Sequence, residues 1–210
     1  MSAALAGTAG RRFALLDCGI VAGPLFAGAV LVQAAARPGF DPSRHPLSLL
    51  ALGPHGWVQV SAFVLTGLLA IAGAVGVRRA LHSGPAGTWG PLLYGLFGVA
   101  MIASGVLPAD PYNGYPAQEA ETITWHGVAH DSAATVSGIA VLAASLVFAR
   151  RYAKLRRRGW MAYCLTVPVL DLALSGAAGA ASDFRLLLLA GIVDWTFLAV
   201  IAVQLRGNAK

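Results

Sequence analysis

Six long apolar runs constrain this chain more than any other feature. They lie near residues 13–36, 57–77, 89–107, 127–149, 160–181 and 186–205. Each run has about 19 to 24 residues, which as a helix rising 1.5 Å per residue can cross about 30 Å of hydrocarbon. Only 11% of the 210 residues are charged, whereas a soluble domain carries roughly 25%. The sequence therefore predicts an all-α fold: one transmembrane domain over residues 1–210, a bundle of six transmembrane helices.

The basic residues indicate how these helices are oriented. If the spans alternate in direction, twelve of the 15 Lys and Arg residues fall on one side of the membrane. They are Arg11, Arg12, Arg78, Arg79, Arg150, Arg151, Lys154, Arg156, Arg157, Arg158, Arg206 and Lys210. Arg37, Arg44 and Arg185 fall on the other side. Because cytoplasmic loops are enriched in Lys and Arg, we predict a multi-pass protein of the cell membrane with both termini in the cytoplasm. No basic patch interleaved with aromatics is present, so nucleic acid is not an expected partner.

The second and fourth spans match each other at an offset of about 71 residues, which indicates an internal repeat. At this offset His55-Gly56 meets His126-Gly127, Gln59 meets His130, and Val60 meets Asp131. The first four spans then form two parallel-repeat hairpins, followed by a divergent third hairpin. The alternative is a chance match between Ala- and Gly-rich segments.

His126 and His130 are four residues apart on one predicted helix, so their side chains share a face. This spacing suits two metal ligands, with Asp131 or Asp110 as a third, although the Glu of the best-known two-histidine helical motif is absent. The alternatives are histidines that exchange protons and histidines that only make structural hydrogen bonds. We favour no metal and count His126, His130, Asp131 and Asp110 as candidate catalytic residues.

Asp171 and Asp194 are expected near the middle of the fifth and sixth spans. An unpaired carboxylate at that depth is costly, which makes each a candidate for function. The two could share a proton and act as a catalytic acid, or they could relay protons. A structural alternative is a hydrogen bond to Ser175, Thr166 or Thr196.

The first outer connection, residues 37–56, is too apolar for a solvated linker. Its Leu-Ser-Leu-Leu-Ala-Leu stretch predicts a short helix along the membrane interface. Arg44 and His45 precede it, and an Arg suits a clamp for a carboxylate or phosphate. A salt bridge from Arg44 to Asp110 or Asp131 is the alternative. We add Trp57, Gln59 and Trp195 to Arg44 and His45 as candidate substrate contacts.

Several motifs carry a resemblance to a known family. They are Arg44-His45-Pro46-Leu-Ser-Leu-Leu-Ala-Leu-Gly53, then Gly56-Trp57-Val-Gln59, the Asp110-Pro111 loop, and His126-Gly127-x-x-His130. With them the chain resembles, over roughly residues 15 to 205, a bacterial membrane family catalogued as a domain of unknown function, DUF998. The resemblance implies a six-helix membrane bundle and no assigned activity.

Taken together, the polar residues predict a membrane-embedded enzyme that applies acid–base chemistry to a lipophilic substrate. Candidate reactions are cyclisation or isomerisation of an isoprenoid-like lipid, or hydrolysis of a lipid. A small proton-coupled transporter and a haem or structural subunit are the alternatives. The expected partners are the lipophilic substrate and membrane lipids, while the cofactor and the oligomeric state are left open.

Overall fold

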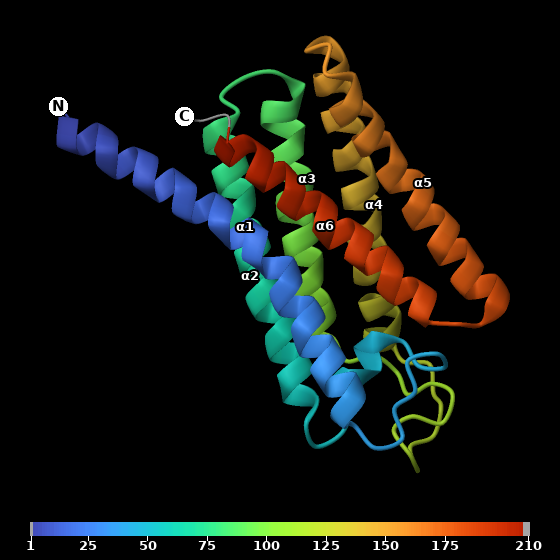
Figure 1. Ribbon diagram of the computed structural model, residues 1–210. Coiled ribbons are helices and arrows are strands. Elements are labelled where there is room, and N and C mark those ends of the chain that lie inside the picture. The colour runs from blue at the N-terminus through green and yellow to red at the C-terminus, as the bar shows by residue number, and fades with distance from the viewer. Residues whose placement is uncertain (1, 208–210) are drawn as a thin grey trace.

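The computed structural model describes residues 2–207, and their side chains from Ala14 onward. These residues form six α-helices and one 3-10 helix (Figure 1). The elements are α1 (Ser2–Ala36), η1 (Leu47–Ala51), α2 (Gly56–Ala80), α3 (Pro85–Val106), α4 (Trp125–Lys154), α5 (Arg158–Ala181) and α6 (Arg185–Gly207). The side chains of Arg11 and Arg12 and all of Lys210 lie outside the described residues. The predicted all-α fold is confirmed.

All six helices are long and apolar enough to cross a membrane, as the predicted six-helix bundle requires. In α1 the candidate span is Ala14–Ala36, close to the predicted 13–36. The other helices extend a few residues past the predicted spans, most clearly α4, which was expected over 127–149. Apolar composition marks the part that suits lipid, whereas backbone hydrogen bonds continue the helix into the polar zone.

The helices form a ring in chain order. Each helix packs against the next one along the chain, and α6 closes the ring against α1. The α2–α3 contact is the tightest where Gly67 faces Gly98, because a Cβ on either glycine would lie 2.6 Å from the carbonyl oxygen of the other. Small residues at this position let the two backbones approach, as is typical of membrane helix pairs.

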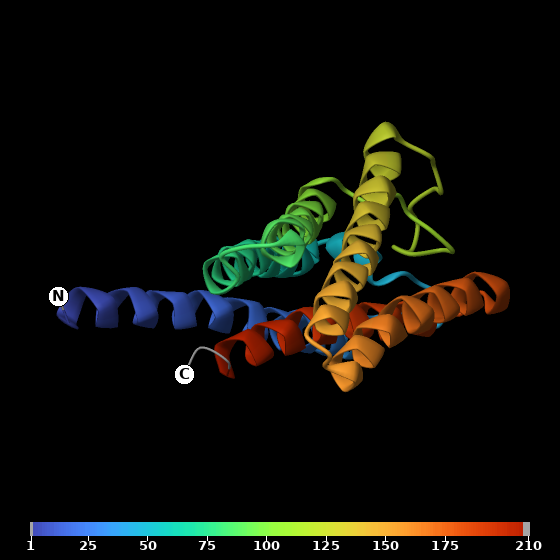
Figure 2. The ribbon, with the colours of Figure 1, turned by 90° about the horizontal axis from the view of Figure 1, so that it is seen from above.

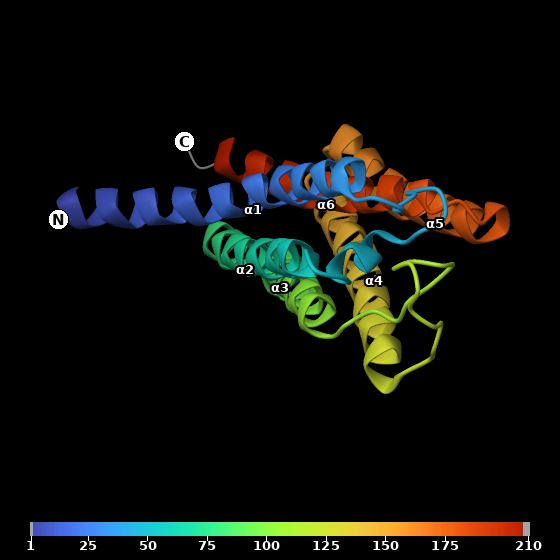
Figure 3. The same cartoon turned by 90° about the horizontal axis from the view of Figure 1, so that it is seen from below.

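The two ends of the ring differ, and we name them by their connections. The loop end carries residues 37–55, 107–124 and 182–184, and the basic end carries residues 81–84 and 155–157. Figures 2 and 3 show α4 crossing the bundle obliquely, so that its first turns at the loop end diverge from α5 and α6. Toward the basic end the helices close on buried aromatic side chains such as Tyr94, Phe148 and Phe197.

A second buried cluster lies under the connections of the loop end. It joins Val30 of α1 to Phe40, Leu49, Leu50 and Tyr115. The predicted short helix is present as η1, but Leu49 and Leu50 are buried in this cluster, so it packs into the bundle as well as flanking it. The outer connections are thereby held as a roof over the loop end.

Candidate functional site

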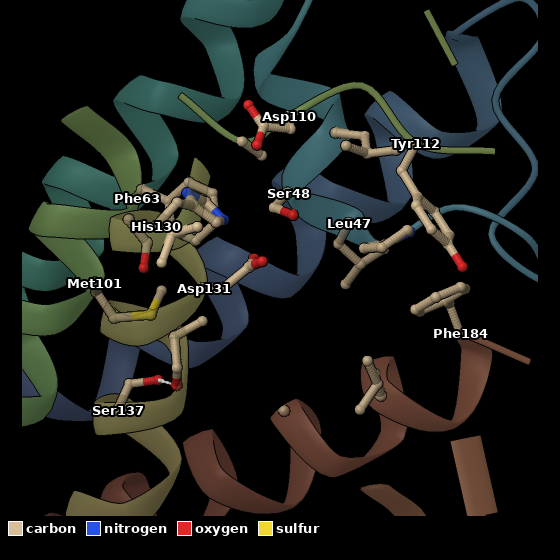
Figure 4. A pocket seen from close by; sticks show the side chains of 18 of the residues that line it. Leu47, Ser48, Phe63, Met101, Asp110, Tyr112, His130, Asp131, Ser137 and Phe184 are labelled. Carbon is tan, nitrogen blue, oxygen red and sulfur yellow. Dashed lines mark hydrogen bonds between the residues drawn. The ribbon is translucent and has the colours of Figure 1, made fainter. Parts of the chain in front are cut away.

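The divergence of α4 leaves a cavity of about 1030 Å³ at the loop end (Figure 4). Its walls come from α1, α2, α3, α4, α6, η1 and the 107–124 connection. None of its described lining residues belongs to α5. Much of the wall is apolar, including Phe26, Phe63, Phe97, Met101 and Trp195. The volume matches the upper range of ligand pockets, about 300 to 1,000 Å³.

His130 brings a titratable ring to this cavity. It is 2% exposed, and its Nδ1 lies 2.9 Å from the carbonyl oxygen of Leu107. Because a carbonyl oxygen can only accept a hydrogen bond, Nδ1 is the donor, and in the neutral ring Nε2 carries a free lone pair. Phe63 packs edge-on to the ring, with centroids 6.3 Å apart. His130 is thus fixed in orientation, with Nε2 available as a proton acceptor.

His126, one turn earlier, does not line the cavity. Its Nδ1 lies 3.1 Å from the carbonyl oxygen of Pro108 and 2.9 Å from Oγ1 of Thr124. The carbonyl groups of Leu107 and Pro108 follow the end of α3, where backbone acceptors lack helical partners. Both histidines therefore pin the end of α3 to the start of α4, and only His130 reaches the cavity. Within residues 2–207 no group of three His, Cys, Asp or Glu side chains is arranged to hold a metal ion.

Asp110 lines the cavity, but its carboxylate already has structural partners. It accepts hydrogen bonds from the backbone N–H of Thr124 (2.8 Å) and from Oγ1 of Thr124 (2.6 Å). Oγ1 of Thr124 in turn accepts from the N–H of Gly127 at 3.1 Å and caps α4. The two bonds from Thr124, helped by His126 and His130, hold the pKa of Asp110 below its ordinary value of 3.8. A Cβ at position 127 would collide with this carboxylate, which explains the glycine there.

Two further carboxyl groups face the cavity without such partners. Asp131 is exposed, and its side chain points from α4 into the cavity (Figure 4). Asp194 of α6 is only 7% exposed, and its Oδ1 has no hydrogen-bond partner among the described residues. Next to it Trp195 is buried and packs edge-to-face on Phe97, with centroids 4.7 Å apart. Asp171 of α5 is buried close enough to interact with Asp194, but it does not line the cavity.

Four of the predicted substrate contacts do not line the cavity: Arg44, His45, Trp57 and Gln59. Arg44 donates to Oδ1 of Asn113 at 3.4 Å, and the structure contains no salt bridge from Arg44 to Asp110 or Asp131. His45 accepts from the N–H of Asp41, so its other ring nitrogen donates to the carbonyl oxygen of Asn113, 3.2 Å away.

Gln59 and Trp57 differ from each other in burial. Gln59 is fully buried and accepts a 2.7 Å hydrogen bond from Gln33, while Trp57 is 67% exposed at the start of α2. Of the eleven candidates, His130, Asp110, Asp131, Asp194 and Trp195 meet at one cavity. Arg44, His45, Trp57, Gln59, His126 and Asp171 do not.

Sequence reasoning missed several residues that build the site. Thr124 is the N-cap of α4, and a Thr directly before an apolar run is a recognisable signal for that role. Arg37 donates to the carbonyl oxygens of Leu50 and Leu52 and so holds the end of η1. Phe184 packs edge-on to Tyr112 and its N–H bonds to the carbonyl of Ser43, which ties the α5–α6 turn to the roof. No local sequence signal indicates these long-range contacts.

Comparisons with known proteins give a family and no activity. No curated protein and no solved structure matches the chain. The family described as "Protein of unknown function (DUF998)" matches residues 20–205. Because the match covers nearly the whole chain, and because six apolar helices fit a membrane family, this multi-pass membrane protein belongs to the DUF998 family.

Proposed function

We propose that this protein is a membrane-embedded enzyme that applies acid–base chemistry to a lipophilic substrate bound in the loop-end cavity. The observation that carries the proposal is the meeting of His130 and Asp194 at one largely apolar cavity of about 1030 Å³. A histidine with a free Nε2 and a carboxyl group without a partner are the two kinds of group that move protons in such chemistry.

The location of the cavity supports a lipophilic substrate. Phe26, Phe63, Phe97 and Met101 line it, and all four belong to membrane-spanning helices. The α4 residues that line it, such as Asp131 and Ala134, are exposed because α5 does not cover them. A substrate dissolved in the lipid therefore has a lateral path between α4 and α6.

Isomerisation of a carbon–carbon double bond is the simplest reaction that uses both groups. The carboxyl group of Asp194, in its neutral form, adds its proton to one alkene carbon, and Nε2 of His130 removes a proton from the carbon next to the other. The double bond moves by one position and no atom is gained or lost. The enzyme is left with an imidazolium and a carboxylate, and transfer of the proton from His130 to Asp194 restores it. Cyclisation of a polyene uses the same two proton transfers.

A transport path through the bundle has less support. Beyond Asp194 the ring is filled by buried side chains, including Phe148, Phe197 and Ile201. Asp171, the second member of the predicted relay, lies behind the cavity wall. Because buried side chains fill the bundle beyond Asp194, the cavity suits a reaction chamber better than a channel across the bundle.

Deuterium incorporation tests the proposal without knowledge of the substrate. The purified protein is incubated in D₂O with a lipid extract of cells that lack it, and the lipids are analysed by mass spectrometry. Proton transfer to carbon places deuterium at a position that does not wash out in H₂O. We expect a lipid that gains deuterium with the wild type, and a loss of about 100-fold or more in rate with His130→Ala or Asp194→Asn.

Matched controls come from the same residue types elsewhere in the chain. His82→Ala changes an exposed histidine of the basic end, and Asp17→Asn changes a carboxylate paired with Arg206. Both should incorporate deuterium at the wild-type rate. Labelling that is absent with the wild type, or that persists in both site variants, would overturn the proposal.

A further inference from the structure

The ionisable side chains that line the loop-end cavity are mostly acidic. Four carboxyl groups line it: Asp110, Glu121, Asp131 and Asp194. Apart from these, His130 is the only lining residue that can carry charge near neutral pH, and no described lining residue is a Lys or Arg. An acidic interior is unusual in a chain whose formal net charge is +6.

The cations at the loop end do not neutralise these carboxyl groups. That end has three Lys or Arg residues, and each is engaged elsewhere. Arg37 donates to the carbonyl oxygens of Leu50 and Leu52, and Arg44 donates to Asn113. Arg185 forms an ion pair with Asp183 at 2.6 Å. No protein cation of this end is left to face the cavity.

The carboxyl groups themselves fall into two pairs. Asp110 is satisfied by Thr124, and Glu121 accepts from the N–H of Gly114 at 3.1 Å. Asp131 makes no side-chain hydrogen bond or ion pair within residues 2–207, and Oδ1 of the nearly buried Asp194 has no partner. In its neutral form, as the proposed proton donor, Asp194 needs no counter-ion, whereas the unpaired carboxylate of Asp131 calls for one. Here the ligand has to supply it.

Aromatic rings add a second attraction for positive charge. Tyr112 and Phe184 both line the cavity, 5.8 Å apart between ring centroids, and Figure 4 shows both beside Leu47. Deeper in, Phe97 and Trp195 are in edge-to-face contact. Rings of this kind attract a cation that lies over their faces, and an apolar site strengthens the attraction.

We propose that the ligand of the loop-end cavity is a lipophilic cation, an amphiphile with an amine or quaternary ammonium head and a hydrocarbon tail. Asp131 is the counter-ion for the head beneath the roof, and the tail lies along Phe63, Phe97 and Met101. Anionic lipids and prenyl diphosphates are poor ligands, because they place negative charge beside four carboxyl groups. The inference rests on the proposed function only in using the same cavity, and it names the charge class of the substrate.

The test measures binding, so that it can fail independently of catalysis. The protein is placed in nanodiscs of zwitterionic lipid, and equilibrium dialysis with empty nanodiscs as the blank gives the Kd of three probes of equal chain length. The probes are dodecyltrimethylammonium, dodecanol and dodecyl sulfate, each below its micelle concentration. We expect the ammonium to bind at least about tenfold more tightly than the alcohol, and the sulfate more weakly still.

Variants of Asp131 test whether the preference for a positively charged probe arises in the cavity. Asp131→Asn should weaken ammonium binding by about tenfold and leave dodecanol binding unchanged, while Asp131→Glu should restore it. Asp17→Asn, at the basic end, should have no effect. Asp131 is exposed, so its variants should fold, and circular dichroism and gel filtration check this directly.

The outcomes separate the two proposals. Equal Kd values for ammonium and sulfate, or ammonium binding that Asp131→Asn leaves intact, would overturn the inference, whatever the deuterium experiment gives. Ammonium binding that depends on Asp131, with no deuterium incorporated into any lipid, would support the inference and remove the proposed catalytic role. A cavity that binds only dodecanol would leave the enzyme proposal with a neutral substrate and reject the cation.

Discussion

The loop end and the basic end of this bundle differ in the sign and the position of their charged side chains. At the loop end four carboxyl groups line an interior cavity, and the three cations are engaged in the roof and the α5–α6 turn. At the basic end six cations lie within residues 150–158, near the surface. The interior of that end is filled by buried aromatic side chains. The one acid near that end, Asp17, is paired with Arg206 at 2.8 Å.

We interpret this difference as one between charge that sets the predicted topology and charge that belongs to the proposed site. Cations in a short connection stay in water and cost little, and their value is to hold that connection on one side of the membrane. Carboxyl groups among membrane helices are costly, which makes those that line the cavity candidates for function. The contrast predicts that substitutions at the two ends will change different properties of the protein.

The largest expected effect is on orientation. Replacing the six cations of residues 150–158 by Gln removes half of the twelve basic residues assigned to the cytoplasmic side. We expect a mixed or inverted population, because the Lys and Arg bias sets topology. Labelling of a Gln118→Cys reporter by a membrane-impermeant maleimide, in a Cys18→Ser, Cys164→Ser background, measures it in intact cells.

The matched control for orientation is Arg44→Gln at the loop end, which should leave the reporter outside in all molecules. Uniform external labelling in the chain without the six cations would contradict the predicted role of the basic end. Internal labelling in the wild type would invert the predicted orientation of both termini.

A smaller effect is expected on stability, and it too should differ between the ends. Phe148 is 2% exposed and packs on Phe197 in the closed core, with centroids 6.2 Å apart. Phe148→Ala leaves a void there and should lower the free energy of unfolding by about 3 kcal/mol. Phe184→Ala, at a cavity that is already open, should cost only about 1 kcal/mol. Unfolding in increasing mole fractions of SDS gives both values, and equal losses would mean that the loop end is as tightly packed as the basic end.

The architecture could be predicted from the sequence because lipid leaves a hydrophobic chain of this length few options. The hydrocarbon thickness fixes the length of each span, so six apolar runs indicate six helices. The orientation and the internal repeat stay predictions. Gln59 and His130, which the repeat aligns, are both buried, but this does not test the repeat.

The site was only partly predictable, since helical spacing gives a shared face and not what that face meets. His126 and His130 were placed together, yet the first turn of α4 sets His126 against Thr124 and Pro108 while His130 reaches the cavity. Asp171 and Asp194 are predicted at one depth, but only Asp194 lines the cavity, because α5 contributes no described residue to its wall. The close approach of Asp110 to Gly127 at the start of α4 joins residues that are 17 positions apart, and no local sequence pattern predicts it.

The smallest expected effect is a pH dependence confined to the loop end. The bonds from Thr124 lower the pKa of Asp110 below 3.8 in the folded protein, so the ionised carboxylate favours the folded state. This contribution is complete above the unfolded pKa and is lost as the pH falls below 3.8 through the folded value. Hydrogen exchange of the first turn of α4 should therefore quicken in acid in the wild type, and much less in Asp110→Asn, which has no carboxylate to titrate.

Thr124→Val sharpens this prediction, because it removes the Oγ1 donor and leaves the backbone bond to Asp110 in place. Its acid response should be intermediate between those of the wild type and Asp110→Asn. Amides around Phe148 should exchange at the same rate in all three proteins, since the acid of the basic end, Asp17, belongs to α1 and pairs with Arg206 of α6. An acid response of equal size at both ends would show that the protein opens as one unit, and that the roof of the cavity is not a separately stabilised part of the fold.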